Sequence, residues 1–166
     1  LPAAPTFSSV TGVDGGANIV VAPGSGGGSP TSYTVTSSPS GGSCTIYAPA
    51  TSCSVSPLTN GTVYTFTVSA TNSTGTTNGA TSSSVTPAGK PGAPTGASAV
   101  RGNGQATVTF TAPTDTGGSA ITSYTVTAYD SSGNAAGTCT GSGTTYTCTG
   151  LTNGAAYTFK ATATTA

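Results

Sequence analysis

The sequence predicts an all-β protein built from two copies of one β-sandwich domain. Three observations predict this fold: a composition that favours strands, an alternation of apolar and polar residues, and an internal repeat of roughly 90 residues. The 37 Thr and 23 Ser carry most of the polarity; Thr, Val and Tyr favour strands, whereas the 25 Gly and 11 Pro favour turns. Leu, Glu and Lys, which favour helices, are nearly absent.

The internal repeat sets the domain organisation. The stretch "LTNGTVYTF" at 58–66 returns 93 positions later as "LTNGAAYTF", and "TSYTV" and "APT" also occur twice, at offsets of 91 and 89. A drifting offset is expected when insertions fall in loops. We therefore expect a first domain at 1–88, a linker rich in Pro and Gly at 89–93, and a second domain at 94–166.

Period-two alternation predicts strands at 64–70 in the first copy and at 106–112, 124–128 and 157–163 in the second, and the first strand is expected at 6–13. Asn-Gly, Gly-Gly and Pro separate them, and about seven short strands per copy is the pattern of two packed antiparallel sheets. The residues expected to face inward are Tyr64, Phe66, Val68, Ala70, Ala106, Val108, Phe110, Ala112, Tyr124, Val126, Ala128, Tyr157, Phe159, Ala161 and Ala163.

The repeated nonapeptide predicts a tyrosine corner in each copy, formed by Leu58 with Tyr64 and by Leu151 with Tyr157. A Tyr six residues after a Leu, across a tight turn, can bury its ring while its hydroxyl bonds back to the corner. This arrangement, followed by "VSATN" and accompanied by a Ser/Thr-rich "GGSAITSYTV" segment, resembles the bacterial extracellular type of fibronectin type III domain. The resemblance covers nearly the whole chain and implies two tandem immunoglobulin-like sandwiches.

The sequence departs from that family in its core and at its end. The usual Trp of the second strand is replaced by Phe110 in the second copy and by Val20 in the first, so we expect the first core to be lighter and less stable. The first copy continues through 72–87 to supply a seventh strand, whereas the second stops at Ala166 and is expected to lack one. Either the chain was shortened or its tail omitted, or a strand from another molecule fills the gap.

Two cysteine pairs with equal spacing predict two disulfides, Cys44–Cys53 and Cys139–Cys148, each closing a small hairpin. Neither copy has a His or a third Cys to complete a metal site. Free buried thiols are the alternative, and recurrence at the same spacing argues against them. Disulfides place the protein in an oxidising compartment, so we expect an extracellular or cell-surface location. A start at Leu1 without Met is expected of a processed product.

Charge and residue types exclude several functions. Three cations and three anions are too few to bind nucleic acid or an anionic membrane surface, and no apolar run could cross a membrane. Without His or Glu, and with Asp14, Asp115 and Asp130 far apart in sequence, we expect no catalytic, metal or cofactor site. A carbohydrate ligand would need exposed aromatics in a row; only Tyr47 and Tyr146, inside the Cys loops, are candidates, and covering neighbouring strands is their simpler role.

The function predicted by elimination is that of a non-catalytic structural or adhesive module of a bacterial extracellular assembly. Its expected partners are other protein chains, with self-assembly through an open sheet edge as one route. A spacer or accessory module of a secreted carbohydrate-active enzyme, and a phage surface decoration, are the alternatives. What flanks these 166 residues would distinguish them.

Overall fold

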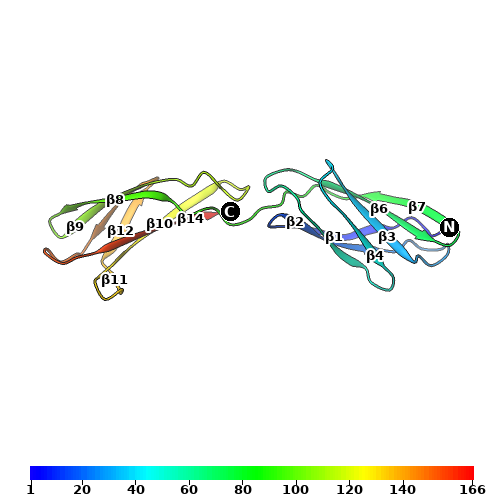
Figure 1. Ribbon diagram of the computed structural model, residues 1–166, viewed down its shortest axis with the longest axis horizontal. Helices are drawn as coiled ribbons and strands as arrows, with labels where there is room; N and C mark the ends of the chain where they lie inside the picture. Colours follow the sequence, from blue (N-terminus) through cyan, green and yellow to red (C-terminus); the bar gives the residue numbers. More distant parts are fainter. The chain divides into compact units, whose positions relative to one another are not determined.

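The computed structural model describes residues 1–166 as two compact units, Leu1–Gly89 (domain 1) and Lys90–Ala166 (domain 2). Every regular element is a β-strand and every pairing between strands is antiparallel, so the expected all-β fold is confirmed (Figure 1). The division falls within the Pro- and Gly-rich segment at 89–93. The structure contains no helix long and apolar enough to cross a membrane.

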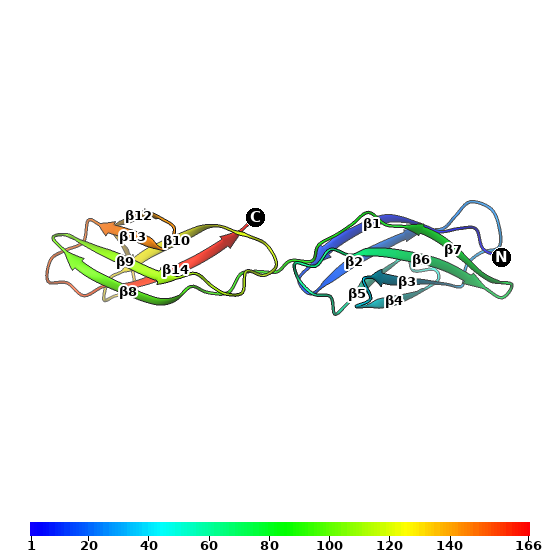
Figure 2. The ribbon, with the colours of Figure 1, turned by 90° about the horizontal axis from the view of Figure 1, so that it is seen from above.

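Domain 1 has seven strands in two sheets. One sheet has the order β1-β2-β5 and the other β4-β3-β6-β7, and Figure 2 shows β7 running beside β6. The first strand has the expected bounds, 6–13. The bounds are β1 Thr6–Val13, β2 Gly16–Ala22, β3 Ser32–Ser38, β4 Ser43–Tyr47, β5 Ser52–Val55, β6 Thr65–Asn72 and β7 Gly75–Thr81.

The core of domain 1 lies between its sheets and follows from the alternation. Every second residue of β6 points inward, so Phe66, Val68 and Ala70 are buried while Thr67 is exposed. The twelve buried hydrophobic residues of this core are Ala17, Ile19, Val21, Tyr33, Val35, Ile46, Val55, Leu58, Tyr64, Phe66, Val68 and Ala70.

Domain 2 repeats the arrangement with two differences: the counterpart of β4 stays in the sheet of β9, and the last strand has no neighbour on its outer side. Its sheets have the orders β12-β13-β9-β8 and β11-β10-β14, so β14 has β10 on one side and a free edge on the other. Its counterpart in domain 1, β6, lies between β3 and β7. The bounds are β8 Thr95–Gly102, β9 Gln105–Thr111, β10 Ile121–Tyr129, β11 Ala135–Ala136, β12 Thr138–Ser142, β13 Thr145–Thr149 and β14 Thr158–Thr165.

The expectation of a lighter core in domain 1 is wrong. Val20 is only half-buried, and the hairpin register aligns Phe110 with Val21, which is 2% exposed. The buried cluster of domain 1 has twelve residues, whereas that of domain 2 has five: Val108, Phe110, Val126, Ala128 and Cys148. The missing Trp matters less than the segment after β6, because that segment covers the core in domain 1.

Candidate interaction surface

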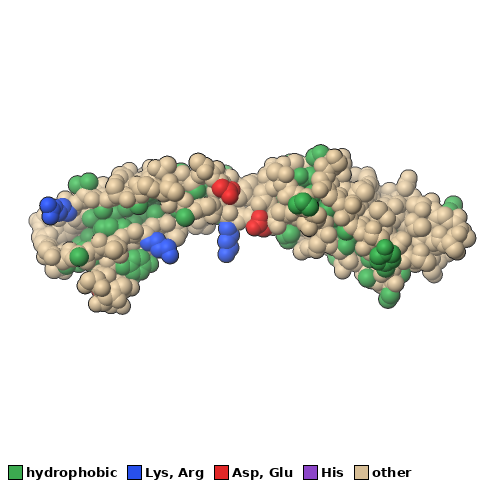
Figure 3. All heavy atoms as spheres, in the orientation of Figure 1, with side chains coloured by type: hydrophobic (Ala, Val, Ile, Leu, Met, Phe, Trp, Pro, Cys, Tyr) green, Lys and Arg blue, Asp and Glu red, His purple; other side chains and the backbone are tan.

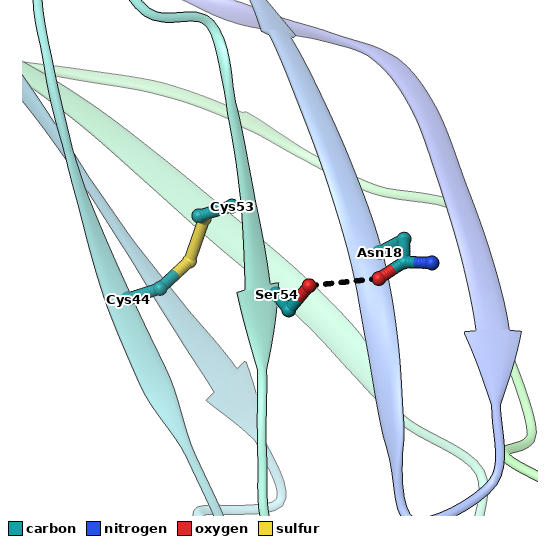
Figure 4. Close-up of a disulfide and its surroundings, with 4 residues drawn as sticks. All are labelled: Asn18, Cys44, Cys53 and Ser54. Carbon is teal, nitrogen blue, oxygen red and sulfur yellow. Dashed lines mark hydrogen bonds between the residues drawn. A yellow bond between two sulfur atoms is a disulfide. The ribbon is translucent and has the colours of Figure 1, made fainter.

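The two disulfides differ in the strands that they connect: one links two sheets, and the other links two paired strands of one sheet. Cys44 on β4 is bonded to Cys53 on β5, and these strands belong to different sheets (Figure 4). The expected hairpin closure is therefore wrong in domain 1, because β4 pairs with β3 while β5 pairs with β2. This bond ties the two sheets together, with its Cα atoms 6.3 Å apart.

In domain 2 the second disulfide does close a hairpin. Cys139 and Cys148 lie directly opposite each other on β12 and β13, which pair within one sheet. Cys148 is fully buried and packs within the core cluster. The same C-x8-C spacing thus serves as a bridge between sheets in one domain and as a rung within a sheet in the other.

A tyrosine hydroxyl closes the corner before β6 in domain 1 and the corner before β14 in domain 2. The Tyr64 hydroxyl accepts a hydrogen bond from the Thr59 N–H at 3.1 Å, and the Tyr157 hydroxyl accepts one from the Thr152 N–H at 2.9 Å. Tyr64 is buried, whereas Tyr157 is half-buried. These are the hydrogen bonds by which a tyrosine corner holds its turn.

An asparagine in each corner forms a second clamp that reasoning from the sequence missed. Asn60 Oδ1 accepts a hydrogen bond from the Gly15 N–H, and Asn153 Oδ1 accepts one from the Gly104 N–H, both at 2.8 Å. Each asparagine therefore fastens its corner to the first hairpin of its domain. The signal was present, since "TNG" recurs in both nonapeptides.

The three carboxylates lie in turns and accept hydrogen bonds there. Asp14 accepts a hydrogen bond from the Asn60 side chain, and Asp115 accepts one from the Gly117 N–H. Asp130 accepts backbone N–H bonds from Ser132 and Asn134 at 2.9 and 3.0 Å. The bond from the Asn134 backbone is the main cause that lowers the pKa of Asp130 below its ordinary 3.8. No group of three or more His, Cys, Asp or Glu side chains is placed to hold a metal ion.

The two tyrosines inside the Cys loops differ in environment. Tyr47 is 72% exposed. Tyr146 is half-buried, stacks on Phe110 with ring centroids 6.0 Å apart, and donates its hydroxyl hydrogen to the Tyr124 carbonyl at 3.0 Å. Only Tyr47 is therefore exposed, so the two domains do not present the same aromatic surface.

The free edge of β14 is the most prominent surface feature of domain 2. In domain 1 the segment 75–87 covers the corresponding edge: Tyr64 exchanges two backbone hydrogen bonds of 2.8 Å with Val85, and Phe66 accepts one from the Ser82 N–H. Val85 packs against the core. By the same register, the backbone groups of Tyr157 and Phe159 lie on the free edge in domain 2.

Two hollows in domain 2 follow the path that 75–87 takes in domain 1. One of about 390 Å3 lies between β8 and the start of β14, and one of about 410 Å3 lies between 90–93 and 160–165. Hydrophobic side chains gather on the surface between β8 and β14 (Figure 3). All eight residues of β8 are exposed, as expected of a strand whose inner face lacks a cover. We call this surface, with both hollows, the β8–β14 groove.

The class of protein that these features define is a tandem pair of immunoglobulin-like β-sandwiches. The family model for the fibronectin type III domain matches the chain twice, over residues 3–87 and 92–166. The chain therefore belongs to the fibronectin type III family. No curated protein matches the sequence.

One of the similar solved structures shows the same architecture at low sequence identity. The chain is similar to domains A168–A170 from titin, with 19% identity and a TM-score of 0.56 over 99% of this chain and 61% of the titin chain. It is also similar to a two-domain fibronectin type III segment from chicken tenascin, with 20% identity and a TM-score of 0.44 over 99% of this chain and 91% of that segment. The chain thus spans about three fifths of the titin chain, and the likeness to it shows the fold alone.

Proposed function

We propose that this chain is a non-catalytic structural or adhesive module of a bacterial extracellular assembly, such as a surface fibre or a cell-envelope protein. Tandem fibronectin type III domains are typical of structural and adhesion modules and are typically non-catalytic. The finer proposal concerns the bacterial setting and the assembly with other protein chains. The Ser- and Thr-rich sequence with few charges supports the setting.

The observation that carries the proposal is that the polar side chains form hydrogen bonds that hold turns and corners. Asp115 and Asp130 accept hydrogen bonds within their own turns, and Asp14 accepts one from the corner residue Asn60. The asparagines and tyrosines of the corners accept hydrogen bonds from backbone N–H groups. These groups shape loops and do not converge on a reacting atom, as general acid–base or nucleophilic catalysis would require. What the molecule presents is a sheet edge, which is a surface for protein contact.

The cysteines support an extracellular location. Two disulfides in domains this small are consistent with an extracellular location, since thiols stay reduced in the cytosol. A bond between the sheets of domain 1 and a cross-strand bond in domain 2 suit a module that must keep its shape outside the cell. We therefore place the proposed assembly at the cell surface or in the surrounding medium.

Electron microscopy of unextracted material from the source, with the mass of the intact mature chain, tests the proposal. We expect ordered fibres or a surface layer in which this chain is a repeating component. Dispersed particles, together with a catalytic domain in the same polypeptide, would contradict it. The tandem pair would then be a spacer of a secreted carbohydrate-active enzyme.

A further inference from the structure

The sheet β4-β3-β6-β7 of domain 1 has one uncovered edge, which is the strand β4. At the opposite edge, the N-terminal segment lies beside β7, and the Ala80 N–H donates a hydrogen bond to the Pro5 carbonyl. β4 pairs only with β3. The Cys44–Cys53 disulfide fixes β4 to the other sheet through a side chain and uses none of its backbone groups. The outer backbone edge of β4 is therefore open and held in place.

The ladder between β3 and β4 shows which backbone groups lie on this edge. At its two ends, the Ala48 N–H donates to the Thr31 carbonyl and the Ser37 N–H donates to the Gly42 carbonyl. Bonded and non-bonded pairs alternate in an antiparallel ladder, so the even-numbered residues of β4 are the ones bonded to β3. The odd-numbered residues, whose N–H and C=O groups point away from β3, are Ser43, Thr45 and Tyr47.

β4 has none of the features that keep an edge strand from pairing with another chain. Natural edge strands are protected by charged side chains, by proline or by bulges. Three other edge strands, β1, β7 and β8, each have a shift in register that interrupts their ladder. The ladder of β4 runs over its five residues without a shift, and residues 43–47 include no proline and no charge.

The outer face of the sheet beside this edge is also uncharged. The outward side chains of β4, β3 and β6 all carry a hydroxyl group, and we call them the hydroxyl face. They are Ser43, Thr45, Tyr47, Ser32, Thr34, Thr36, Thr67, Ser69 and Thr71. Two such faces can meet side by side without repulsion between like charges. Its one large side chain, Tyr47, lies at the open edge and is 72% exposed.

From these observations we propose that β4 pairs in antiparallel fashion with β4 of a second copy of the chain, about a two-fold axis between the two Thr45 residues. This register is self-complementary, because Ser43 of each copy lies opposite Tyr47 of the other. The N–H and C=O groups that point away from β3 then bond across the new ladder. The hydroxyl face continues from one copy to the next. The Tyr47 ring lies over Ser43 of the second copy, which covers its exposed surface.

Length and closure favour a second copy as the occupant. Proline cannot donate to a ladder, so Pro39 and Pro49 limit the pairing to the residues between them. A second copy offers a strand of the same length, the same hydroxyl side chains and no charge. The two-fold arrangement uses the β4 edge of both copies, so this contact closes at two chains and leaves no edge of its kind open.

Thr45 provides the test, because it lies at the proposed axis. Thr45→Lys places two positive charges opposite each other, and Thr45→Glu places two negative ones. In sedimentation equilibrium we expect the unmodified 166-residue chain to form a dimer, each variant alone to be a monomer, and an equal mixture of the two variants to dimerise again. The dimer of the mixture should weaken at high salt.

A matched control lies on an edge strand of domain 2. Thr140 is exposed on β12, which is the edge of its sheet and carries no charge. Thr140→Lys changes the net charge as Thr45→Lys does, so the proposed pairing leaves this variant a dimer.

Two further variants separate the backbone from the side chains. Thr45→Pro removes an outward N–H, and an edge strand tolerates proline at such a position, so the ladder with β3 should remain while the dimer is lost. Tyr47→Ser keeps every backbone group and should raise the dissociation constant roughly tenfold, because buried tyrosines contribute strongly to interfaces.

Hydrogen exchange tests the register. As the concentration of the chain rises, the amides of Ser43, Thr45 and Tyr47 should exchange more slowly, because they become bonded to the second copy. The amides of Cys44 and Ile46 are already bonded to β3 and should change little.

Several results would overturn the proposal. It fails if the unmodified chain is still a monomer at about 1 mM, where even a weak dimer forms. It fails if Thr140→Lys prevents dimerisation as Thr45→Lys does, or if the mixture of the two Thr45 variants remains monomeric. It also fails if rising concentration protects amides of another strand in place of those of β4, because the contact surface then lies elsewhere.

This inference deepens the proposed function by naming one partner, a second copy, and rests on it for the setting in an assembly. The two can fail separately. Sedimentation and hydrogen exchange measure pairing in solution and do not depend on whether fibres form, whereas microscopy of the native material does not depend on which strands are in contact.

Discussion

At the scale of the residue, one side-chain hydroxyl holds each corner. The Thr59 and Thr152 N–H groups lie in the turns before β6 and β14, where no sheet partner is present, and a Tyr hydroxyl accepts a hydrogen bond from each. A backbone donor left without a partner in a buried place costs free energy, so the corner depends on this acceptor. The effect is expected to be larger in domain 1, because Tyr64 is 4% exposed and Tyr157 is half-buried.

Replacing each corner tyrosine by phenylalanine tests this dependence. Tyr64→Phe should lower the free energy of unfolding of domain 1 by about 1 kcal/mol, and Tyr157→Phe should lower that of domain 2 by less, since water can replace the hydroxyl there. Denaturant unfolding measures both. Tyr47→Phe is the control, because Tyr47 is 72% exposed and its loss should change stability little. Equal losses at all three positions would contradict the role of the corner.

Asp130 provides a test of pH dependence at a single loop. Its pKa is lowered in the folded protein, mainly by the Asn134 backbone N–H, so ionisation favours the folded loop. The stabilisation is present above the unfolded pKa near 3.8 and is lost as the pH falls through the lower folded pKa. Amide chemical shifts of Ser132 and Asn134 should titrate with a midpoint below 3.8, and the Asp130→Asn variant should not show this titration. A midpoint above 3.8 would refute the assignment.

At the scale of the element, identical cysteine spacing gives two different connections. Because β4 has moved to the sheet of β3 while β5 stays with β2, the bond between them crosses from sheet to sheet. In domain 2, β12 remains paired with β13, and the bond adds to an existing ladder. Whether the disulfide links two sheets or lies within one sheet depends on the strand that pairs with β4 or with β12. It does not depend on the loop between the cysteines.

Removing each disulfide separates the effect of loop length from that of position. Both bonds link residues nine apart, so Cys44→Ala with Cys53→Ala and Cys139→Ala with Cys148→Ala should each destabilise their own domain by about 2 kcal/mol. Hydrogen exchange should then show faster opening between the sheets of domain 1, whereas the β12–β13 ladder stays protected. If neither pair changes stability in denaturant unfolding, the bonds do not constrain the unfolded chain as proposed.

At the scale of the whole molecule, the two domains bury their cores unequally. Positions that are buried in β6 are only half-buried in β14, as the pairs Phe66 with Phe159 and Ala70 with Ala163 show. Residues 75–87 remove this face from water in domain 1, and the β8–β14 groove leaves it accessible in domain 2. Burial of apolar surface is the main favourable term in folding, so the domains should differ in stability.

Calorimetry of the intact protein should therefore resolve two transitions, the first of them belonging to domain 2. Assignment comes from hydrogen exchange during heating: amides of β10 and β14 should lose protection before those of β3 and β6. One transition in which all four strands open together, or domain 1 opening first, would contradict the argument.

Reasoning from sequence reached the fold through local patterns. Alternation in "YTFTVSA" is a property of neighbouring residues, and it placed Tyr64, Phe66, Val68 and Ala70 inward, where the structure has them buried. The repeat identified two domains in the same way. These features depend on residues close in the chain, so the sequence alone could determine them.

Tertiary structure decided what depends on segments far apart. Whether Val20 or Val21 faces the core depends on the register of β2, because a shift of one residue exchanges the faces of a strand. The sheet that β4 joins determined which strands Cys44 and Cys53 connect. Arg101 and Phe159 lie far apart in the chain and line one hollow because β8 and β14 lie close together in the folded domain. Local sequence thus determined the strands and the repeat, whereas long-range packing determined the register of β2 and the sheets that the Cys44–Cys53 bond connects.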